Sequence, residues 1–152
     1  MTGRITKSTN IDSGTRWIFT DTADKPLITK DSRNHTTKFY YDQLQRPTET
    51  VSPLPKGAGG IFDFILEKTI YGTDTITNTK GKPVEQCDQS GKTTIWEYDF
   101  KGNLLHSQKQ ICQDYKNVID WNTTQLFTDD IFETTIKYDA LNQIMEKTEL
   151  FL

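Results

Sequence analysis

Three aspartates that each follow a tyrosine are the most repeated acidic residues of the chain: Asp42, Asp99 and Asp139. Two carboxylates can act as acid and base when their surroundings separate their pKa values. Each of these aspartates, however, opens a short polar segment, and the sequence provides no two contrasting environments for them. We therefore expect all three to begin turns, and we assign no catalytic residue.

The other reactive side chains are isolated. His35 and His106 are the two histidines, and neither has a second ligand at metal-binding spacing, so no metal site is expected. Cys87 and Cys112 form no CxxC motif; two free, half-buried thiols are favoured, and one disulfide is the alternative. A nucleophile pair of Cys112 and His106 lacks an orienting acid. Residues 56–60 are glycine-rich but lack the Lys-Ser/Thr ending and the helix of a phosphate-binding loop, so they are expected to be a connector.

Composition favours a polar β protein. Hydrophobic residues make up 34% and aromatic residues 11% of the 152 residues, and threonine is the commonest residue. No run of about 18 apolar residues is present, so no membrane span is expected. The net charge of −3 argues against duplex nucleic acid as a partner. The first residues lack the apolar core of a signal peptide; either export uses another route, or the chain is an internal segment of a longer polypeptide.

An internal repeat with an offset of 57 residues organises the sequence. It aligns residues 20–27 with 77–84, 31–37 with 88–94, and 39–42 with 96–99. A third, partial copy covers residues 134–142. The chain is therefore expected to be built from copies of one supersecondary unit.

A finer unit recurs inside each copy. Asp or Asn begins a polar segment whose fourth residue is Gly, Asn, Asp or Gln, a pattern typical of turns in which the fourth residue has positive φ. Successive units lie 10 and then 11 residues apart, which is one strand plus one turn. The pattern predicts β-hairpins with turns that begin at Asp21, Asp31, Asp42, Asn78, Asp88, Asp99, Asp114 and Asp139.

The residues between turns alternate as in half-buried strands. Trp96 is expected to share one face with Thr94 and Tyr98, and Phe39 to share the equivalent face with Tyr41. The three tyrosines of the repeat, which include Tyr138, are expected to pack across the sheet.

The expected organisation is an irregular N-terminal lead over residues 1–14, followed by a repeat sheet over residues 15–152. Loops are expected near residues 51–60, where Pro and Gly gather, and near 120–130, where the pattern is lost. Residues 61–66 are predicted to be a strand, with a short helix as the alternative, and the loop at 120–130 has room for one helical turn.

The recurring Tyr-Asp-x-x-Gly/Asn motif resembles the YD repeat of the RHS family, and the likeness covers roughly residues 15–150. It is closest over residues 98–105 and continues through 114–116, 120–121 and 138–142. The residues that define the repeat are Tyr41, Asp42, Tyr98, Asp99, Gly102, Tyr138, Asp139 and Asn142.

This resemblance implies an all-β fold of antiparallel hairpins, a segment of a long sheet that spirals into a hollow shell. In bacterial toxin complexes related to this family, the shell encloses a toxin. Many members cleave themselves after a DPxGL-like motif, which this chain lacks, so that chemistry is not transferred to any residue here. The implied function is a wall segment around a toxin or other cargo polypeptide, with no catalysis and no cofactor. The implied partners are the cargo or adjacent repeats of a longer chain, and the implied location is the outside or surface of a bacterium.

The alternative function is a module that binds carbohydrate or cell surfaces. Exposed aromatic rings with nearby amides suit the faces of sugars, and Trp17, Trp96 and Trp121 are the candidates for stacking. An enzyme is the least favoured class, because no acid, base or nucleophile can be told apart from the turn residues.

Overall fold

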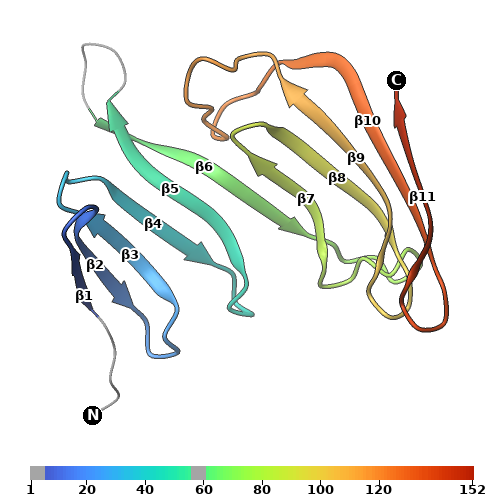
Figure 1. Cartoon of the computed structure of the whole chain (residues 1–152), viewed down its shortest axis with the longest axis horizontal. Helices are drawn as coiled ribbons and strands as arrows, with labels where there is room; N and C mark the ends of the chain where they lie inside the picture. The colour runs from blue at the N-terminus through green and yellow to red at the C-terminus, as the bar shows by residue number, and fades with distance from the viewer. Residues whose placement is uncertain (1–5, 56–60) are drawn as a thin grey trace. The chain divides into compact units, whose positions relative to one another are not determined.

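The computed structural model describes residues 6–55 and 61–152, and it contains only β-strands as regular elements in this part of the chain (Figure 1). The all-β expectation is therefore confirmed. No helix that could cross a membrane occurs in these two ranges. The strands are β1 Lys7–Asn10, β2 Gly14–Thr20, β3 Pro26–Asp31, β4 Thr36–Tyr41, β5 Pro47–Pro55, β6 Ile61–Tyr71, β7 Pro83–Asp88, β8 Gly91–Tyr98, β9 Leu104–Cys112, β10 Phe127–Tyr138 and β11 Ile144–Phe151.

Every strand hydrogen-bonds to the next strand along the chain, in the order β1 to β11. The pairs whose register is resolved are all antiparallel, as expected for hairpins joined end to end. The chain divides into two compact units, one ending at Leu66 and one running from Glu67 to Leu152. The two units are described separately below.

The turns have the geometry that the repeat predicts. A positive φ is found at the fourth residue of every predicted unit except the one that begins at Asp114. In the turn at Asp42, the N–H of Gln45 donates to the Asp42 carbonyl, and the Asp42 N–H donates to the carbonyl of Arg46. This is a type I turn followed by a left-handed residue, the common three-residue hairpin connection. A one-residue shift in register beside the turn, between Tyr40 and Tyr41, accompanies it.

The buried side chains are few and lie on both faces of the sheet. In the first unit, Val51, Phe64 and Ile65 are buried on β5 and β6. In the second unit, Cys87 and Cys112 are buried on one face and Ile95 and Ile136 on the other, and Tyr98 and Ile119 are buried as well. No described side chain is less than 2% exposed, as expected of a sheet without a second packed layer.

Ile119, at 3% exposure, anchors the loop between β9 and β10. Its backbone N–H donates to Oε1 of Gln89, and the Gln89 Nε2 donates to its carbonyl, at 2.9 and 3.0 Å. The indole Nε1 of Trp121 donates to the Asp88 carbonyl at 3.1 Å. The loop therefore folds back over the turn between β7 and β8, and it contains no helical turn.

Three predicted boundaries are wrong. Lys7–Asn10, placed in the irregular lead, forms β1, because the Asn10 side chain accepts from the N–H of Asp12 and starts a turn of its own. Residues 51–55, placed in a loop, complete β5 despite their prolines; residues 56–60 lie outside the described part. Residues 127–130, also placed in a loop, begin β10. The strand prediction for residues 61–66 is confirmed by β6.

The predicted alternation in β8 is also wrong. Ile95 and Tyr98 are both buried at 8% exposure, whereas Trp96 is 50% exposed. The pairing with β9 shifts register between Ile95 and Glu97, so Trp96 lies in a bulge. Bulges insert one residue into a strand and reverse the alternation beyond it. Trp96 therefore does not occupy the position of Phe39 in the first copy.

Candidate functional site

Two tyrosines of the repeat make the same long-range hydrogen bond. The hydroxyl of Tyr41 donates to the carbonyl of Pro26 at 2.8 Å, and that of Tyr98 donates to the carbonyl of Pro83 at 2.7 Å. Each bond spans 15 residues and ties the end of one hairpin to the start of the preceding strand. Burial raises the pKa of Tyr98, so its hydroxyl stays protonated and can donate.

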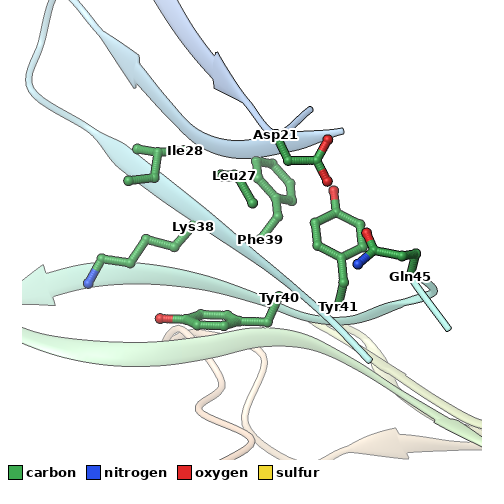
Figure 2. A pocket seen from close by; sticks show the side chains of 8 residues that line it. All are labelled: Asp21, Leu27, Ile28, Lys38, Phe39, Tyr40, Tyr41 and Gln45. Carbon is green, nitrogen blue, oxygen red and sulfur yellow. The ribbon is translucent and has the colours of Figure 1, made fainter. Parts of the chain in front are cut away.

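The lysine before each of these prolines lies over the tyrosine ring. Lys25 Nζ is 5.4 Å from the ring centre of Tyr41, and Lys82 Nζ is 4.7 Å from that of Tyr98. Such cation–π contacts add a modest attraction at exposed sites. Lys25 also donates to the carbonyl of Gln45, in the neighbouring turn. Figure 2 shows Tyr41 between Asp21, from the turn between β2 and β3, and Gln45, from the turn between β4 and β5.

The repeated aspartates act as turn acceptors. Asp42 Oδ1 accepts from the N–H groups of Leu44 and Arg46, both at 2.9 Å, and Asp139 Oδ1 accepts from Leu141 and Gln143 at 2.8 and 2.9 Å. Asp99 Oδ1 does the same with the N–H groups of residues 101–103. With their lone pairs engaged in this way, these carboxylates hold backbone in place, which agrees with the expectation that they begin turns.

These hydrogen bonds favour the ionised carboxylates. The N–H of Arg46 lowers the pKa of Asp42, with burial opposing it and the Arg46 side chain adding to the lowering. At Asp114, the side-chain amide of Asn117 and then its backbone N–H lower the pKa. At Asp99, burial acts to raise the pKa, but the hydrogen bonds from Asn103, Gly102 and Lys101 outweigh it. The same direction is found at Asp31, Asp74 and Asp88.

We predict that stability falls in acid. A pKa that is lower in the folded chain means that the unfolded chain binds more protons, so this contribution is complete above the unfolded pKa of about 4. It is lost as the pH falls through the lower folded values. Urea unfolding between about pH 5 and pH 2.5 should show a falling midpoint. The variant Asp42→Asn keeps an oxygen acceptor and should show a shallower fall; an unchanged midpoint across this range would contradict the prediction.

The third copy keeps the turn but lacks the tyrosine clamp, that is, the hydrogen bond from the tyrosine hydroxyl to a proline carbonyl. The residue that lies 15 positions before Tyr138 is Thr123, and the hydroxyl of Tyr138 has no hydrogen-bond partner among the described residues. Its turn is instead joined to the turn at Asp99 by two side chains. Lys101 Nζ donates to the Ala140 carbonyl at 2.5 Å, and Asn103 Nδ2 donates to Asn142 Oδ1 at 3.1 Å. Neighbouring turns on one side of the second unit are thus linked to each other.

The histidines and cysteines do not form a reactive centre. His35 lies in a turn, 3.2 Å from Asp31 Oδ2, and His106 Nε2 lies 2.6 Å from Glu133 Oε1 on the adjacent strand. Both thiols are free, as favoured, but they are buried and not half-buried. Burial, followed by the charge of Glu85, raises the pKa of Cys87 to about 12. Among the residues with described positions, no three His, Cys, Asp or Glu side chains are grouped to hold a metal ion.

The three tryptophans do not form one platform. Trp17 lies on β2, with Lys7 Nζ 5.9 Å from its ring centre. Trp96 lies in the bulge of β8, with its ring centre 6.5 Å from that of His106. Trp121 packs against Phe127 near the opposite end of β8, where its indole reaches the Asp88 carbonyl.

The hollow around Tyr40 and Tyr41 also lacks the form of a ligand pocket. It has a volume of about 500 Å³ and is lined by residues of both faces of β3 and β4. Lys38 and Tyr40 point to one side of β4 and Phe39 and Tyr41 to the other, as Figure 2 shows. Side chains on opposite faces of a sheet cannot converge on one small molecule.

Comparison with known proteins finds structural neighbours only. No family model and no curated protein sequence matches the chain. The crystal structure of TcdB2-TccC3 superimposes with a TM-score of 0.85 and 20% identity, covering 97% of this chain and 8% of that chain. The Photorhabdus luminescens Tc holotoxin pore with a mutated TccC3 has a TM-score of 0.85 and 21% identity, covering 97% of this chain and 7% of that chain. TcdB2-TccC3 without its hypervariable C-terminal region has a TM-score of 0.81 and 20% identity, covering 94% of this chain and 7% of that chain.

These matches establish a shared β-fold with toxin-complex chains. The chain spans less than a tenth of the length of each of these neighbours. The likeness is consistent, at the level of the fold, with the resemblance to the RHS family.

Proposed function

We propose that this chain is a stretch of wall in an RHS-type β-shell that encloses a toxin or other cargo polypeptide, without catalysis of its own. The main support is the fold match over 97% of the chain to a small part of a toxin-complex chain. Pairing of strands in chain order suits a wall, because each added hairpin extends the sheet without rearranging the earlier ones. The partners in this proposal are adjacent repeats and the enclosed polypeptide, and the location is the outside or surface of a bacterial cell.

The exposed apolar side chains support the same role. Large hydrophobic residues such as Phe19, Phe62 and Leu150 are more than half exposed on strands. A free-standing domain rarely leaves so many uncovered, whereas a wall can present them to neighbouring repeats or to an unfolded polypeptide. The alternative function, glycan binding, is supported less well, because the three tryptophans are separated.

We predict that the native polypeptide containing this chain protects a cargo segment from protease. An antibody against residues 61–152 should detect a polypeptide several times larger than 17.5 kDa, because the structural neighbours are more than ten times longer. Limited trypsin digestion should leave a cargo segment intact until mild urea opens the wall. The same segment expressed alone is the control and should be digested at once. Equal digestion rates in both cases would contradict the enclosure.

A further inference from the structure

A hollow of about 410 Å³ lies beside Trp96 in the second unit. The indole of Trp96 lines it and is half exposed, and this residue lies in the bulge of β8. Bulges often re-aim a side chain next to a functional site. Two carboxylates also line the hollow, Asp74 from the loop between β6 and β7 and Glu85 from β7; none of its described lining residues is a lysine, arginine or histidine. The hollow is therefore aromatic and negatively charged.

Both carboxylates can accept further hydrogen bonds. The N–H of Ile76, followed by the hydroxyl of Thr77, lowers the pKa of Asp74, so this carboxylate is ionised at neutral pH. Glu85 has two long contacts, with Lys92 Nζ 3.7 Å from its Oε2 and with Cys87 Sγ 3.7 Å from its Oε1. A carboxylate has about four acceptor positions, and contacts of this length leave room for shorter ones.

The first copy of the repeat builds the same hairpin without these groups. The offset of 57 residues aligns Glu85 with Ile28 and Trp96 with Phe39. The tyrosine clamp is nevertheless formed in both copies. A carboxylate and an outward tryptophan are thus not needed for the hairpin itself, which favours a role in binding.

We propose that this hollow binds an arginine side chain of a polypeptide that lies against this face of the wall. A guanidinium group stacks on an aromatic ring and donates several hydrogen bonds to carboxylates. Trp96 supplies the ring, and Asp74 and Glu85 supply the acceptors and the opposite charge. A neutral sugar could use the ring but would gain nothing from the charge of the two carboxylates. The identification of the bound polypeptide as the cargo rests on the proposed function.

NMR spectroscopy of the 152-residue chain tests this site. The chain has three tryptophans, so three indole N–H signals are expected, and the variant Trp96→Phe identifies the signal of Trp96. N-acetyl-arginine amide should shift that signal with a Kd of about 1–10 mM. N-acetyl-citrulline amide has a similar shape without the charge and should bind at least about threefold more weakly. The signals of Trp17 and Trp121 should not move.

A matched pair of variants tests the charge. Glu85→Gln keeps the shape of the side chain and removes its charge, so the Kd for N-acetyl-arginine amide should rise about threefold or more. Glu149→Gln is the control, because Glu149 lies in the row of Thr134 and Ser107, on the face opposite Glu85. Its charge is screened from the hollow, so the Kd should stay within about 1.5-fold.

Three results would overturn the arginine site. They are equal affinity for the arginine and citrulline amides, the same Kd in Glu85→Gln as in the unchanged chain, and a Trp96 signal that methyl glucoside shifts but arginine amide does not. Each is distinguishable from failure of the wall proposal, which the protease experiment reports. Arginine amide can bind without cargo present, and a wall can enclose cargo without this contact.

Discussion

Replacing Gly91 by alanine is expected to reduce the free energy of unfolding by about 3 kcal/mol. Gly91 is the first residue of β8 and has a φ of 155°. It pairs with Asp88 on one side and with Ile111 on the other. A Cβ here would overlap the carbonyl oxygen of Gln110 and lie 3.0 Å from Ile111 Cα. These are backbone atoms of a strand, so they can move only if the pairing of β8 with β9 is disrupted.

Gly102→Ala is the matched control for this prediction. Gly102 also has a positive φ, 100°, but a Cβ there would meet only the end of the Lys82 side chain, with Nζ at 3.1 Å and Cε at 3.5 Å. These atoms end a flexible side chain and can move away, so the loss should be limited to backbone strain of about 1–2 kcal/mol. Urea titration followed by circular dichroism would measure both variants. Equal losses would contradict the backbone overlap, and a Gly91→Ala chain that lacks β signal in the absence of urea would support it.

Replacing Tyr98 by phenylalanine is expected to reduce the free energy of unfolding by about 1–2 kcal/mol. The change removes only the hydroxyl that donates to the Pro83 carbonyl at 2.7 Å. Tyr98 is 8% exposed, so water cannot readily replace the lost donor. The Pro83 carbonyl would then lose a buried partner, which is the expensive part of such a change.

Tyr138→Phe makes the same chemical change in the third copy. The Tyr138 hydroxyl has no partner in the described part of the chain, so its loss should change stability by less than about 0.5 kcal/mol. Tyr41→Phe should lie between the two, because Tyr41 makes the same bond as Tyr98 but is less buried. Chemical denaturation of the three variants would test this order. A loss at Tyr138 as large as that at Tyr98 would show that the clamp to proline is not the cause.

The turns could be predicted from the sequence because their geometry is local. An aspartate that accepts from the N–H two residues ahead, and a fourth residue with positive φ, both lie within five residues of chain. The residues of the tyrosine clamp could also be found from the sequence, because a Lys-Pro pair precedes Tyr41 and Tyr98 at the same distance. The repeat alone does not show that the tyrosine hydroxyl donates to the proline carbonyl.

The bulge at Trp96 could not be predicted from the repeat. Asp31 closes its turn onto the carbonyl of His35, the fifth residue, whereas Asp88 pairs with Gly91, the fourth. The pairing of β7 with β8 is therefore shifted by one residue relative to the pairing of β3 with β4, and the bulge restores the equivalent register before Tyr98. Turn closure of either kind is compatible with the same sequence pattern. The contact between His106 and Glu133 was missed for a similar reason, because it depends on the register across a long loop.

Strand pairing in chain order has a consequence for synthesis. Because each strand needs only the strand before it, every new hairpin can add to the sheet as soon as it leaves the ribosome. Sheets whose strands pair over long separations must instead wait and pay a larger loop entropy, and they fold slowly. Here the growing end always presents one unpaired strand, and that strand is covered by the next residues to be translated. The order of translation thus gives the order of assembly, without a late step that joins distant segments.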